Sequence, residues 1–249
     1  DLDFFSLTTT CCQIDIKKLF KGGFNTGHGF LREPGSIQSY SALACIAIQS
    51  NQNDQHGGQS IPAFDYYLAD GVAKTFRRTY RSNTIKAMKI IYGNVAPDCD
   101  DKIKEFEKQV GLYAKIEMHS EYLKKFNEFL VKELKVKTKD LDKINKFAYS
   151  ESLAETDKRT FQAMEGIVHN LNTMHSRAGA QVPFSSINFG TDISPEGRMV
   201  TKNLLLAHDA GLGNGETPIF PILIFKVKES VNYNPEDPNY DLFKLACRI

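Results

Sequence analysis

The chain has 249 residues, 41% of them hydrophobic, and a formal net charge of +1 at pH 7. This length can hold one large domain or two small ones, and the near-neutral charge gives no general attraction for nucleic acid or a membrane surface. No run of about eighteen apolar residues occurs, which excludes a membrane-spanning helix. Five cysteines without framework spacing favour the reducing cytoplasm over a secreted disulfide scaffold. The acidic start without an initiator Met predicts a cut end and no signal peptide.

The first predicted elements are a strand, a loop and two long helices. Residues 7–16 are rich in Thr, Ile and Cys and predict a strand. A glycine-rich loop follows, and Ser36 is expected to cap a mostly buried helix that runs to about residue 50. A glycine pair at 57–58 ends that helix, and a second long helical pattern covers residues 64–92.

The second half alternates helices and strands. Residues 97–147 balance Lys against Asp and Glu, which predicts a solvated helical hairpin rather than a basic binding arm. The later alternation predicts a parallel sheet with crossover helices. Its expected elements are a helix ending near His175, a strand at 181–190, a helix capped by Ser194 with Pro195 in its first turn, a strand at 217–227 and a helix from about Asp237.

Four strings in chain order carry a family resemblance. They are TTTCCQIDIKKLFKGGFNTGHGFLREPGSI, SNQNDQHGGQSIPAFDYYLADGV, HNLNTMHSRAGAQVPFSSINFGTDISPEGRM and GLGNGETPIFPILIFKVKESVNYNPEDPNYDLFKLA. Together they resemble the anaerobic, class III ribonucleotide reductases, the glycyl-radical enzymes that make deoxyribonucleotides. Residues 94–150 carry no such signature.

The resemblance implies an α/β fold, the first half of a ten-stranded α/β barrel with added helices. Residues 1–249 would form a partial catalytic barrel domain. Within it, 36–150 would be a mostly helical dimer and effector region, and 151–249 would alternate helix and strand. The helices at 36–50 and 64–92 look like the family's homodimer interface, where an ATP or dNTP effector selects the substrate.

The implied activity is the reduction of ribonucleoside triphosphates by radical chemistry. In the family, a glycyl radical near the C-terminus generates a thiyl radical on a finger-loop cysteine, which takes the ribose 3′-hydrogen. A reductive cysteine, with formate or a dithiol, completes the reduction. A radical-SAM activating enzyme, which uses S-adenosylmethionine and an iron–sulfur cluster, is the implied partner. The chain shows no match to the finger loop, the glycyl-radical site, the zinc ribbon or the ATP cone, so we expect a partial chain that is inactive alone.

Two adjacent cysteines, Cys11 and Cys12, are tied most closely to this chemistry. Removing the 2′-hydroxyl of ribose needs a thiol that donates a proton or hydrogen atom, and burial in a strand keeps a cysteine neutral. Adjacent strand residues point to opposite faces, so one thiol can face a barrel interior. The alternative is a pair of small buried hydrophobic residues. The resemblance assigns the reductive role to Cys11, four residues before Asp15, with Cys12 in reserve. We expect Cys11 to point inward and Cys12 to point toward the helices.

Several polar residues are candidates for nucleotide contact. Asp15 precedes two lysines, a position typical of a cap or salt-bridge partner, with a nucleotide contact as the alternative. Side chains on the strand at 181–190 either line a substrate pocket or bond to the neighbouring strand. A guanidinium fork suits phosphate, although arginines at helix ends commonly face solvent. The candidate substrate-binding residues are Thr10, Arg177, Gln181, Ser185 and Ser186.

Other motifs predict no further site. GLGNG at 211–215 follows a helix and precedes a strand, the reverse of a dinucleotide-binding order, and TGHG at 26–29 lacks the Lys and Ser/Thr of a phosphate loop. The histidines lack metal-ligand spacing and no Cys-x-x-Cys occurs, so no metal site is expected. Two alternative functions stay open: another glycyl-radical enzyme of the formate-lyase type, and a non-catalytic nucleotide-binding or dimerisation module.

Overall fold

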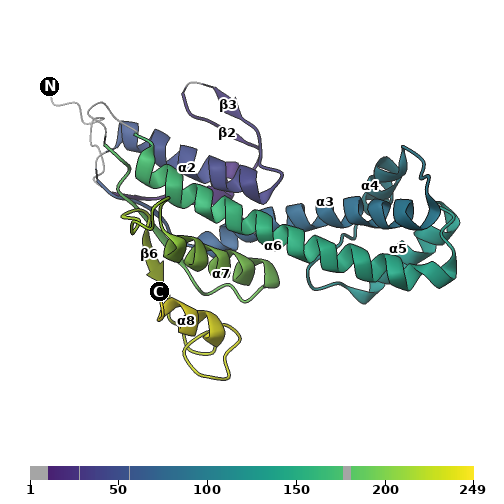
Figure 1. Cartoon of the computed structure of the whole chain (residues 1–249). Coiled ribbons are helices and arrows are strands. Elements are labelled where there is room, and N and C mark those ends of the chain that lie inside the picture. Colours follow the sequence, from purple (N-terminus) through teal and green to yellow (C-terminus); the bar gives the residue numbers. More distant parts are fainter. Residues whose placement is uncertain (1–10, 28, 56, 176–180) are drawn as a thin grey trace. The chain divides into compact units, whose positions relative to one another are not determined.

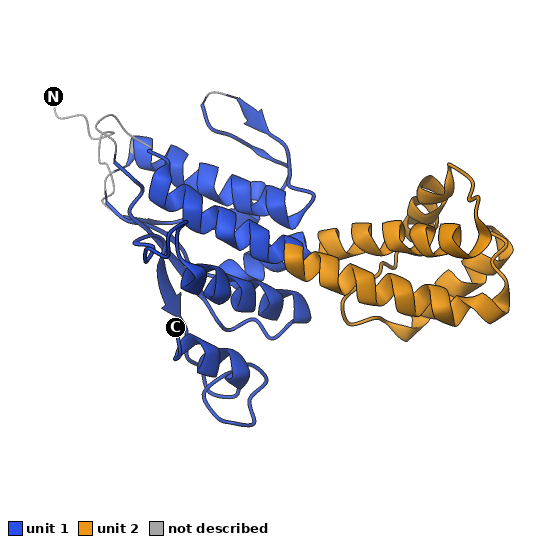
Figure 2. Ribbon diagram, viewed as in Figure 1, with its two compact units in different colours: residues 1–72, 159–249 blue, residues 73–158 orange. Residues whose placement is uncertain are grey.

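The structure is a computed structural model that describes residues 11–27, 29–55, 57–175 and 181–249. The chain divides into two compact units (Figure 2). Unit 1 comprises residues 1–72 and 159–249, and unit 2 comprises residues 73–158. Unit 2 is therefore a continuous segment inserted into the sequence of unit 1.

Helices dominate the described residues, and short strands lie between them (Figure 1). The helices are α1 (Ile16–Phe20), α2 (Ile37–Asp54), α3 (Phe64–Tyr92), α4 (Cys99–Val110), α5 (Ser120–Lys132), the 3₁₀ turn η1 (Thr138–Asp140), α6 (Leu141–Thr173), α7 (Pro195–Ala210) and α8 (Tyr240–Ala246). The strands are β1 (Cys12–Gln13), β2 (Phe24–Asn25), β3 (Phe30–Leu31), β4 (Gln59–Ile61), β5 (Ser185–Phe189) and β6 (Ile222–Phe225).

Unit 1 contains a parallel sheet with the strand order β1-β4-β5-β6. Helices connect the strands, because parallel neighbours need a crossover rather than a tight turn. The predicted α/β class with a parallel sheet is thereby confirmed. The described residues form this open sheet, and the closed barrel stays a prediction.

The two faces of the sheet differ in burial because side chains alternate along each strand. The covered face is buried on β4 and β5 and half-buried on β1 and β6, and its central row is Ile61, Ile187 and Leu223. The open face is half-buried to exposed. The covered face consists of Cys12, Gln59, Ile61, Ser185, Ile187, Phe189, Leu223 and Phe225, and the open face of Gln13, Ser60, Ser186, Asn188, Ile222 and Ile224.

Local sequence signals predicted several helix ends correctly. The Ser36 hydroxyl accepts a hydrogen bond from the Ser39 N–H at 3.3 Å and caps α2. The Ser194 hydroxyl accepts one from the Gly197 N–H at 3.1 Å, with Pro195 as the first residue of α7. The long helical pattern at 64–92 corresponds to α3.

The N-terminal elements differ from the prediction. Within the described residues β1 has two residues, because Asp15 caps α1 and the chain turns helical at Ile16. The glycine-rich segment after α1 contains the antiparallel pair β2 and β3, which was expected to be a loop. Strand β4, which has three residues and directly follows the glycine pair at 57–58, was also not predicted. Elements this short carry too few residues to show a period.

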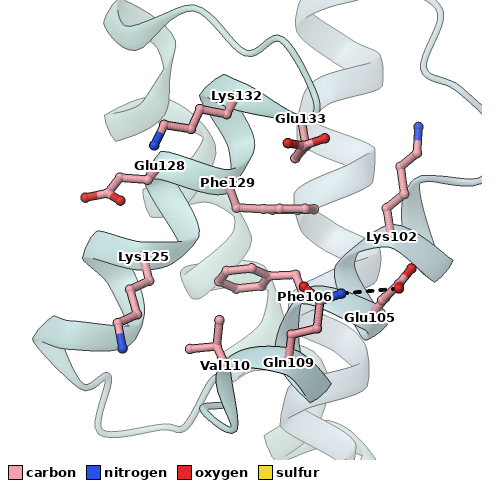
Figure 3. Close-up of a pocket in the computed structure, with 10 residues that line it drawn as sticks. All are labelled: Lys102, Glu105, Phe106, Gln109, Val110, Lys125, Glu128, Phe129, Lys132 and Glu133. Carbon is pink, nitrogen blue, oxygen red and sulfur yellow. Dashed lines mark hydrogen bonds between the residues drawn. The ribbon is translucent and has the colours of Figure 1, made fainter.

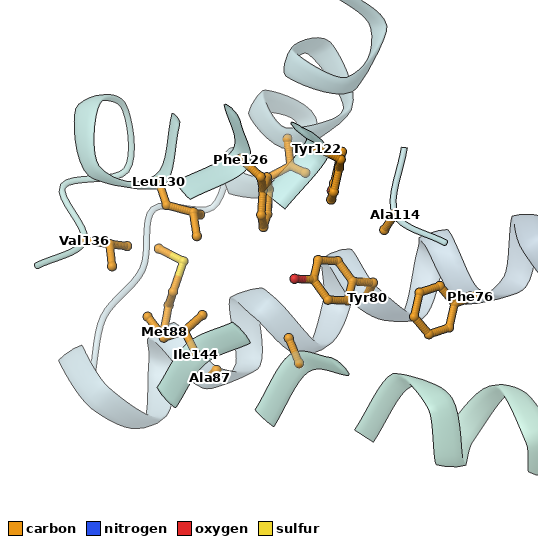
Figure 4. Close-up of a cluster of buried hydrophobic side chains, with 12 residues drawn as sticks. Phe76, Tyr80, Ala87, Met88, Ala114, Tyr122, Phe126, Leu130, Val136 and Ile144 are labelled. Atoms are coloured by element: carbon orange, nitrogen blue, oxygen red, sulfur yellow. The ribbon is translucent and has the colours of Figure 1, made fainter. Parts of the chain in front are cut away.

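Unit 2 has a hydrophobic core of its own and is more than a solvated hairpin (Figure 4). Tyr80, Tyr122 and Phe126 are fully buried, and the rings of Tyr122 and Phe126 stack with centroids 5.4 Å apart. Beside them, the buried Glu107 carboxylate accepts a hydrogen bond from Arg81 Nη1 at 2.9 Å and one from the Tyr122 hydroxyl at 3.3 Å. Burial raises the pKa of the Glu107 carboxyl, while the Arg81 charge opposes that shift.

None of the helices formed by the described residues combines the length and apolar character needed to cross a membrane.

Candidate active site

The open face of unit 1 carries a row of polar side chains across three strands. Gln13, Ser60 and Ser186 are register partners on β1, β4 and β5, so they lie side by side. One row along, the Asn188 amide Nδ2 donates a hydrogen bond to Ser60 Oγ at 3.3 Å. On β6 the open face becomes apolar, with Ile222 51% exposed. A polar row beside an accessible apolar edge can bind a ligand that has both hydroxyls and a flat apolar part.

Cys11 lies at the amino-terminal end of this open face. It is two residues before Gln13, so strand alternation gives it the same side. The residue is exposed and precedes β1, so the expectation of a cysteine buried within a strand was wrong for Cys11. Continuation of the strand register places it opposite Gly58, where an added Cβ would meet nothing closer than the Phe184 carbonyl oxygen at 4.0 Å. The surface next to the Cys11 thiol is therefore unobstructed by a side chain of β4.

Cys12 lies on the covered face and contacts helix α2, as expected from alternation. Asn51 Nδ2 of α2 donates a hydrogen bond to Cys12 Sγ at 3.1 Å. The Cys12 thiol donates to Gln59 Oε1 on β4 at 3.4 Å. The two neighbouring thiols therefore have different surroundings, one accessible and one held by amides.

Asp15 acts as a helix cap. Its carboxylate accepts a hydrogen bond from the Lys18 N–H at 3.0 Å at the start of α1. Asp15 also lies near the phenol of Tyr67, whose pKa is raised first by burial and then by the Asp15 charge. This position corresponds to the capping role that the sequence favoured.

The predicted substrate-binding residues do not converge on one surface. Ser186 belongs to the open face, whereas Ser185 is buried on the covered face, so only Ser186 shares a face with Cys11. Neighbouring strand residues point to opposite faces, so the two serines cannot both face one ligand on the open face, and a substrate contact by either stays a prediction. Gln181 is exposed before β5. Thr10 and Arg177 lie outside the described residues.

A loop at the carboxyl end of β5 is fixed by a residue that sequence reasoning missed. The fully buried Asp65, in the first turn of α3, accepts three backbone hydrogen bonds through Oδ2: from Gly190 at 2.8 Å, Thr191 at 2.9 Å and Asp192 at 2.9 Å. The Tyr66 hydroxyl donates to the Thr191 carbonyl at 2.9 Å. A first-turn acid usually stabilises its own helix end, so the sequence held no signal for this long-range contact.

Two buried asparagines hold the same loop from the C-terminal side. Asn232 Nδ2 donates to the Gly190 carbonyl at 2.9 Å, and Asn239 Nδ2 donates to the Asp192 carbonyl at 2.9 Å. Burial raises the pKa of the Asp192 carboxyl. The loop after β5 is therefore bonded to the start of α3 on one side and to the C-terminal segment on the other.

The remaining reactive groups form no second catalytic set among the described residues. Cys45 is buried in α2, and burial raises the pKa of its thiol to about 12. Within residues 11–27, 29–55, 57–175 and 181–249, no cluster of His, Cys, Asp and Glu is arranged to hold a metal ion.

Unit 2 carries a surface groove of about 610 Å³ between α4 and α5 (Figure 3). The rings of Phe106 and Phe129 stack at its centre with centroids 4.6 Å apart. Lys and Glu side chains alternate around the rim, so the groove selects neither an anion nor a cation. The charged rim residues are Lys102, Glu105, Lys125, Glu128, Lys132 and Glu133.

Comparisons with known proteins identify relatives of one kind. Residues 1–249 match the family described as anaerobic ribonucleoside-triphosphate reductase. The enzyme of that name from Enterobacteria phage T4 is 28% identical over 240 residues, which cover 96% of this chain and 30% of the phage protein. The Escherichia coli (strain K12) enzyme is 25% identical over 249 residues, 99% of this chain and 27% of that protein.

The chain thus spans less than a third of the length of these relatives. The matching family is not the formate-lyase type that the sequence left open as an alternative. Because the match covers residues 1–249, the chain belongs to the anaerobic ribonucleoside-triphosphate reductase family.

Proposed function

We propose that the open face of unit 1 binds a ribonucleoside triphosphate and that Cys11 is the reductive thiol of its anaerobic reduction. The observation that carries this proposal is the pairing of an exposed Cys11 thiol with the polar row of Ser60 and Ser186 on one face of the sheet. Cys12, its neighbour, lies on the opposite face and is held by amide groups.

The chemistry replaces the 2′-hydroxyl of ribose by hydrogen. The Cys11 thiol has one hydrogen, which it can give to the reacting sugar as a proton or as a hydrogen atom while the 2′-oxygen leaves as water; a hydroxyl at that position gives a hydrogen atom far less readily. Ser60, Ser186 and Asn188 supply donors and acceptors that suit ribose hydroxyls, and holding the sugar there orients it toward the thiol. The family's radical would come from a glycyl radical outside this chain, with formate or a dithiol as the final reductant.

The implied partners follow from the same family. We propose that α2 and α3 contribute to a homodimer interface with an ATP or dNTP effector site, and that a radical-SAM activating enzyme serves the full-length protein. Ala42 is an exposed apolar residue on α2. Ala42→Glu should therefore give monomers that no longer respond to effectors. An unchanged mass in light scattering together with an unchanged effector response would contradict the interface.

The experiment that tests the catalytic proposal uses the full-length protein that contains this chain. Cys11→Ser should lower deoxyribonucleotide formation at least about a hundredfold, because loss of a proton- or hydrogen-donating group costs on the order of 10²–10⁴ in rate. Nucleotide binding, measured by calorimetry, and the glycyl radical, measured by electron paramagnetic resonance, should remain. Cys247→Ser, a second exposed cysteine, is the matched control and should keep its turnover.

Two outcomes would overturn the proposal. Near-normal turnover by Cys11→Ser would remove the reductive role from Cys11. Nucleotide binding without turnover in the activated wild-type protein would instead assign the chain to a non-catalytic binding module.

We also propose that the 249-residue chain expressed alone forms no deoxyribonucleotides, even with the activating enzyme, S-adenosylmethionine and formate.

A further inference from the structure

The covered face of the sheet has one polar corner in an otherwise apolar layer. Register pairs Cys12 with Gln59 and Gln59 with Ser185, so these three side chains form a row on β1, β4 and β5. The next row on the same face is Ile61, Ile187 and Leu223. Gln59 is 1% exposed and Ser185 is 2% exposed. Buried amides and hydroxyls cost stability compared with apolar side chains, so core packing alone does not account for this corner.

Helix α2 adds more amide groups to this polar corner. The Asn51 Nδ2 group donates to Cys12 Sγ at 3.1 Å, to Gln55 Oε1 at 3.0 Å and to Gln59 Oε1. The Cys12 thiol donates to the same Gln59 oxygen at 3.4 Å. An amide nitrogen has two hydrogens, so three acceptors share two donors, and the Cys12 thiol both accepts and donates within the cluster.

The attachment of β1 to the sheet is otherwise slight. The strand has two residues, which pair with β4 in parallel, and backbone bonds at this pairing include Cys12 N–H to Gly58 O at 3.0 Å and Ile14 N–H to Ser60 O at 2.7 Å. The thiols themselves do not distinguish the two faces, because residues 11 and 12 are identical. The side chains around the two cysteines must therefore favour the placement of one particular thiol on the covered face.

We propose that Asn51 and Gln59 are positioning residues that hold the Cys12 thiol on the covered face and thereby keep the Cys11 thiol exposed on the open face. Gln59 Nε2 and Ser185 Oγ have no hydrogen-bond partner among the described residues, so the specificity of this corner rests on the contacts that Asn51 Nδ2 and Gln59 Oε1 make with Cys12. A buried hydrogen bond favours one arrangement because water does not replace a lost partner. Here the amides recognise a thiol, which offers both a donor and an acceptor, in a site where a larger side chain would not fit the same contacts. The relevance of this arrangement to catalysis rests on the proposed function, whereas the arrangement itself does not.

The primary test is residue-resolved alkylation in the full-length protein. Iodoacetamide labelling is followed over time, and fragmentation mass spectrometry separates modification at Cys11 from modification at Cys12. In the wild-type protein Cys11 should react at least tenfold faster than Cys12. In the double variant Asn51→Leu with Gln59→Leu this ratio should fall at least fivefold, because nothing then holds the Cys12 thiol.

Gln52→Leu is the matched control, because it removes another buried amide of α2 whose Oε1 has no hydrogen-bond partner among the described residues. It should keep the labelling ratio within twofold of wild type. If the double variant does not melt cooperatively, Cys12→Ser and Cys12→Val give the same test. The hydroxyl can replace the thiol in both hydrogen bonds and should preserve the Cys11 rate, whereas valine can make neither and should change that rate at least fivefold.

Measuring kcat and KM of the double variant distinguishes a positioning role of Asn51 and Gln59 from a general loss of stability. In the double variant kcat should fall at least tenfold while KM for the ribonucleotide stays within twofold, since the substrate-facing row is untouched. Equal labelling of both cysteines in the wild-type protein, or a folded double variant with an unchanged ratio and kcat, would overturn the positioning role. If the labelling ratios behave as expected but Cys11→Ser keeps full turnover, the proposed function fails and the positioning role stands.

Discussion

Gly197 lies directly against the Asp192 side chain, and the contact leaves no room for a methyl group. A Cβ on Gly197 would lie 2.6 Å from the Asp192 Cβ and closer still to its carboxylate. The Asp192 carboxylate also accepts a hydrogen bond from the Ser194 N–H at 2.9 Å, so it cannot move away without losing that bond. The first turn of α7 and the loop after β5 are therefore fitted to each other at this glycine.

Gly197→Ala should lower the free energy of unfolding by about 1–3 kcal/mol, the usual cost of overpacking a buried site. Gly166→Ala is the matched control, because Gly166 lies inside α6 and an added Cβ meets nothing within 4 Å. Alanine there should raise stability by about 0.5–1 kcal/mol through its better helix propensity. Urea denaturation of both variants measures the difference, and equal stabilities would contradict the close contact at Gly197.

Asp65→Ala should lower the free energy of unfolding by about 3–5 kcal/mol, because two buried N–H groups and one half-buried N–H group lose their shared acceptor. Asp101→Ala provides a comparison, since Asp101 is also a first-turn acid but its side chain is 81% exposed and pairs with Lys104 on the surface. That substitution should cost less than about 1 kcal/mol. Hydrogen exchange of the amides at 190–192 should accelerate in Asp65→Ala, and protected amides there would show that another group holds the loop.

Two neighbouring serines should respond to alanine in opposite ways. Ser185 Oγ is buried without a hydrogen-bond partner among the described residues, so Ser185→Ala should leave stability unchanged or raise it by up to about 1 kcal/mol. Ser186→Ala should leave stability unchanged but weaken ribonucleotide binding by about 0.5–1.5 kcal/mol, or roughly twofold to tenfold. Calorimetry that finds weaker binding in Ser185→Ala and not in Ser186→Ala would reverse the assignment of the faces.

His208, near the end of α7, should make stability depend on pH. Burial lowers the pKa of its imidazole below the usual 6.5, so between these two pKa values the unfolded chain binds more protons than the folded one. The stability contributed by neutral His208 is therefore complete above about pH 6.5 and is lost as the pH falls toward the lowered pKa. His208→Gln should flatten the stability curve between about pH 7 and pH 5. His119→Gln, at the exposed start of α5, is the control, and equal slopes in both variants would contradict the role of His208.

The parts of the fold that could be predicted are those determined by residues close together in the sequence. The cap at Ser36 and the whole of α3 follow from signals within one or two helical turns. The contact between Cys12 and Gln59 joins residues 47 positions apart, and that between Asp65 and Gly190 joins residues 125 apart. No local pattern encodes such pairs. The amide contacts of Cys12 and the hydrogen bonds from Asp65 to the loop after β5 were therefore found only in the structure.

The single core of unit 2 could not be predicted for a related reason. Its surface charge is balanced and dense, which resembles a solvated hairpin, but the intervening aromatic residues meet in one core. Their convergence depends on how α3, α4, α5 and α6 pack within the unit. For the candidate site, the sequence and its family resemblance selected Cys11 and Ser186, but burial was needed to separate Ser186 from Ser185.

The insertion of unit 2 into unit 1 sets an order of assembly during synthesis. Ser60 on β4 and its partner Asn188 on β5 are 128 residues apart, and all of unit 2 lies between them. A nascent chain therefore exposes α2 and β4 well before β5 leaves the ribosome, while unit 2 is already complete and has a core of its own. Folding of unit 2 first shortens the loop that must close to pair β4 with β5 and lowers its entropic cost. Early folding of the inserted helices would thus help the sheet to form by bringing the chain segments that carry β4 and β5 closer together.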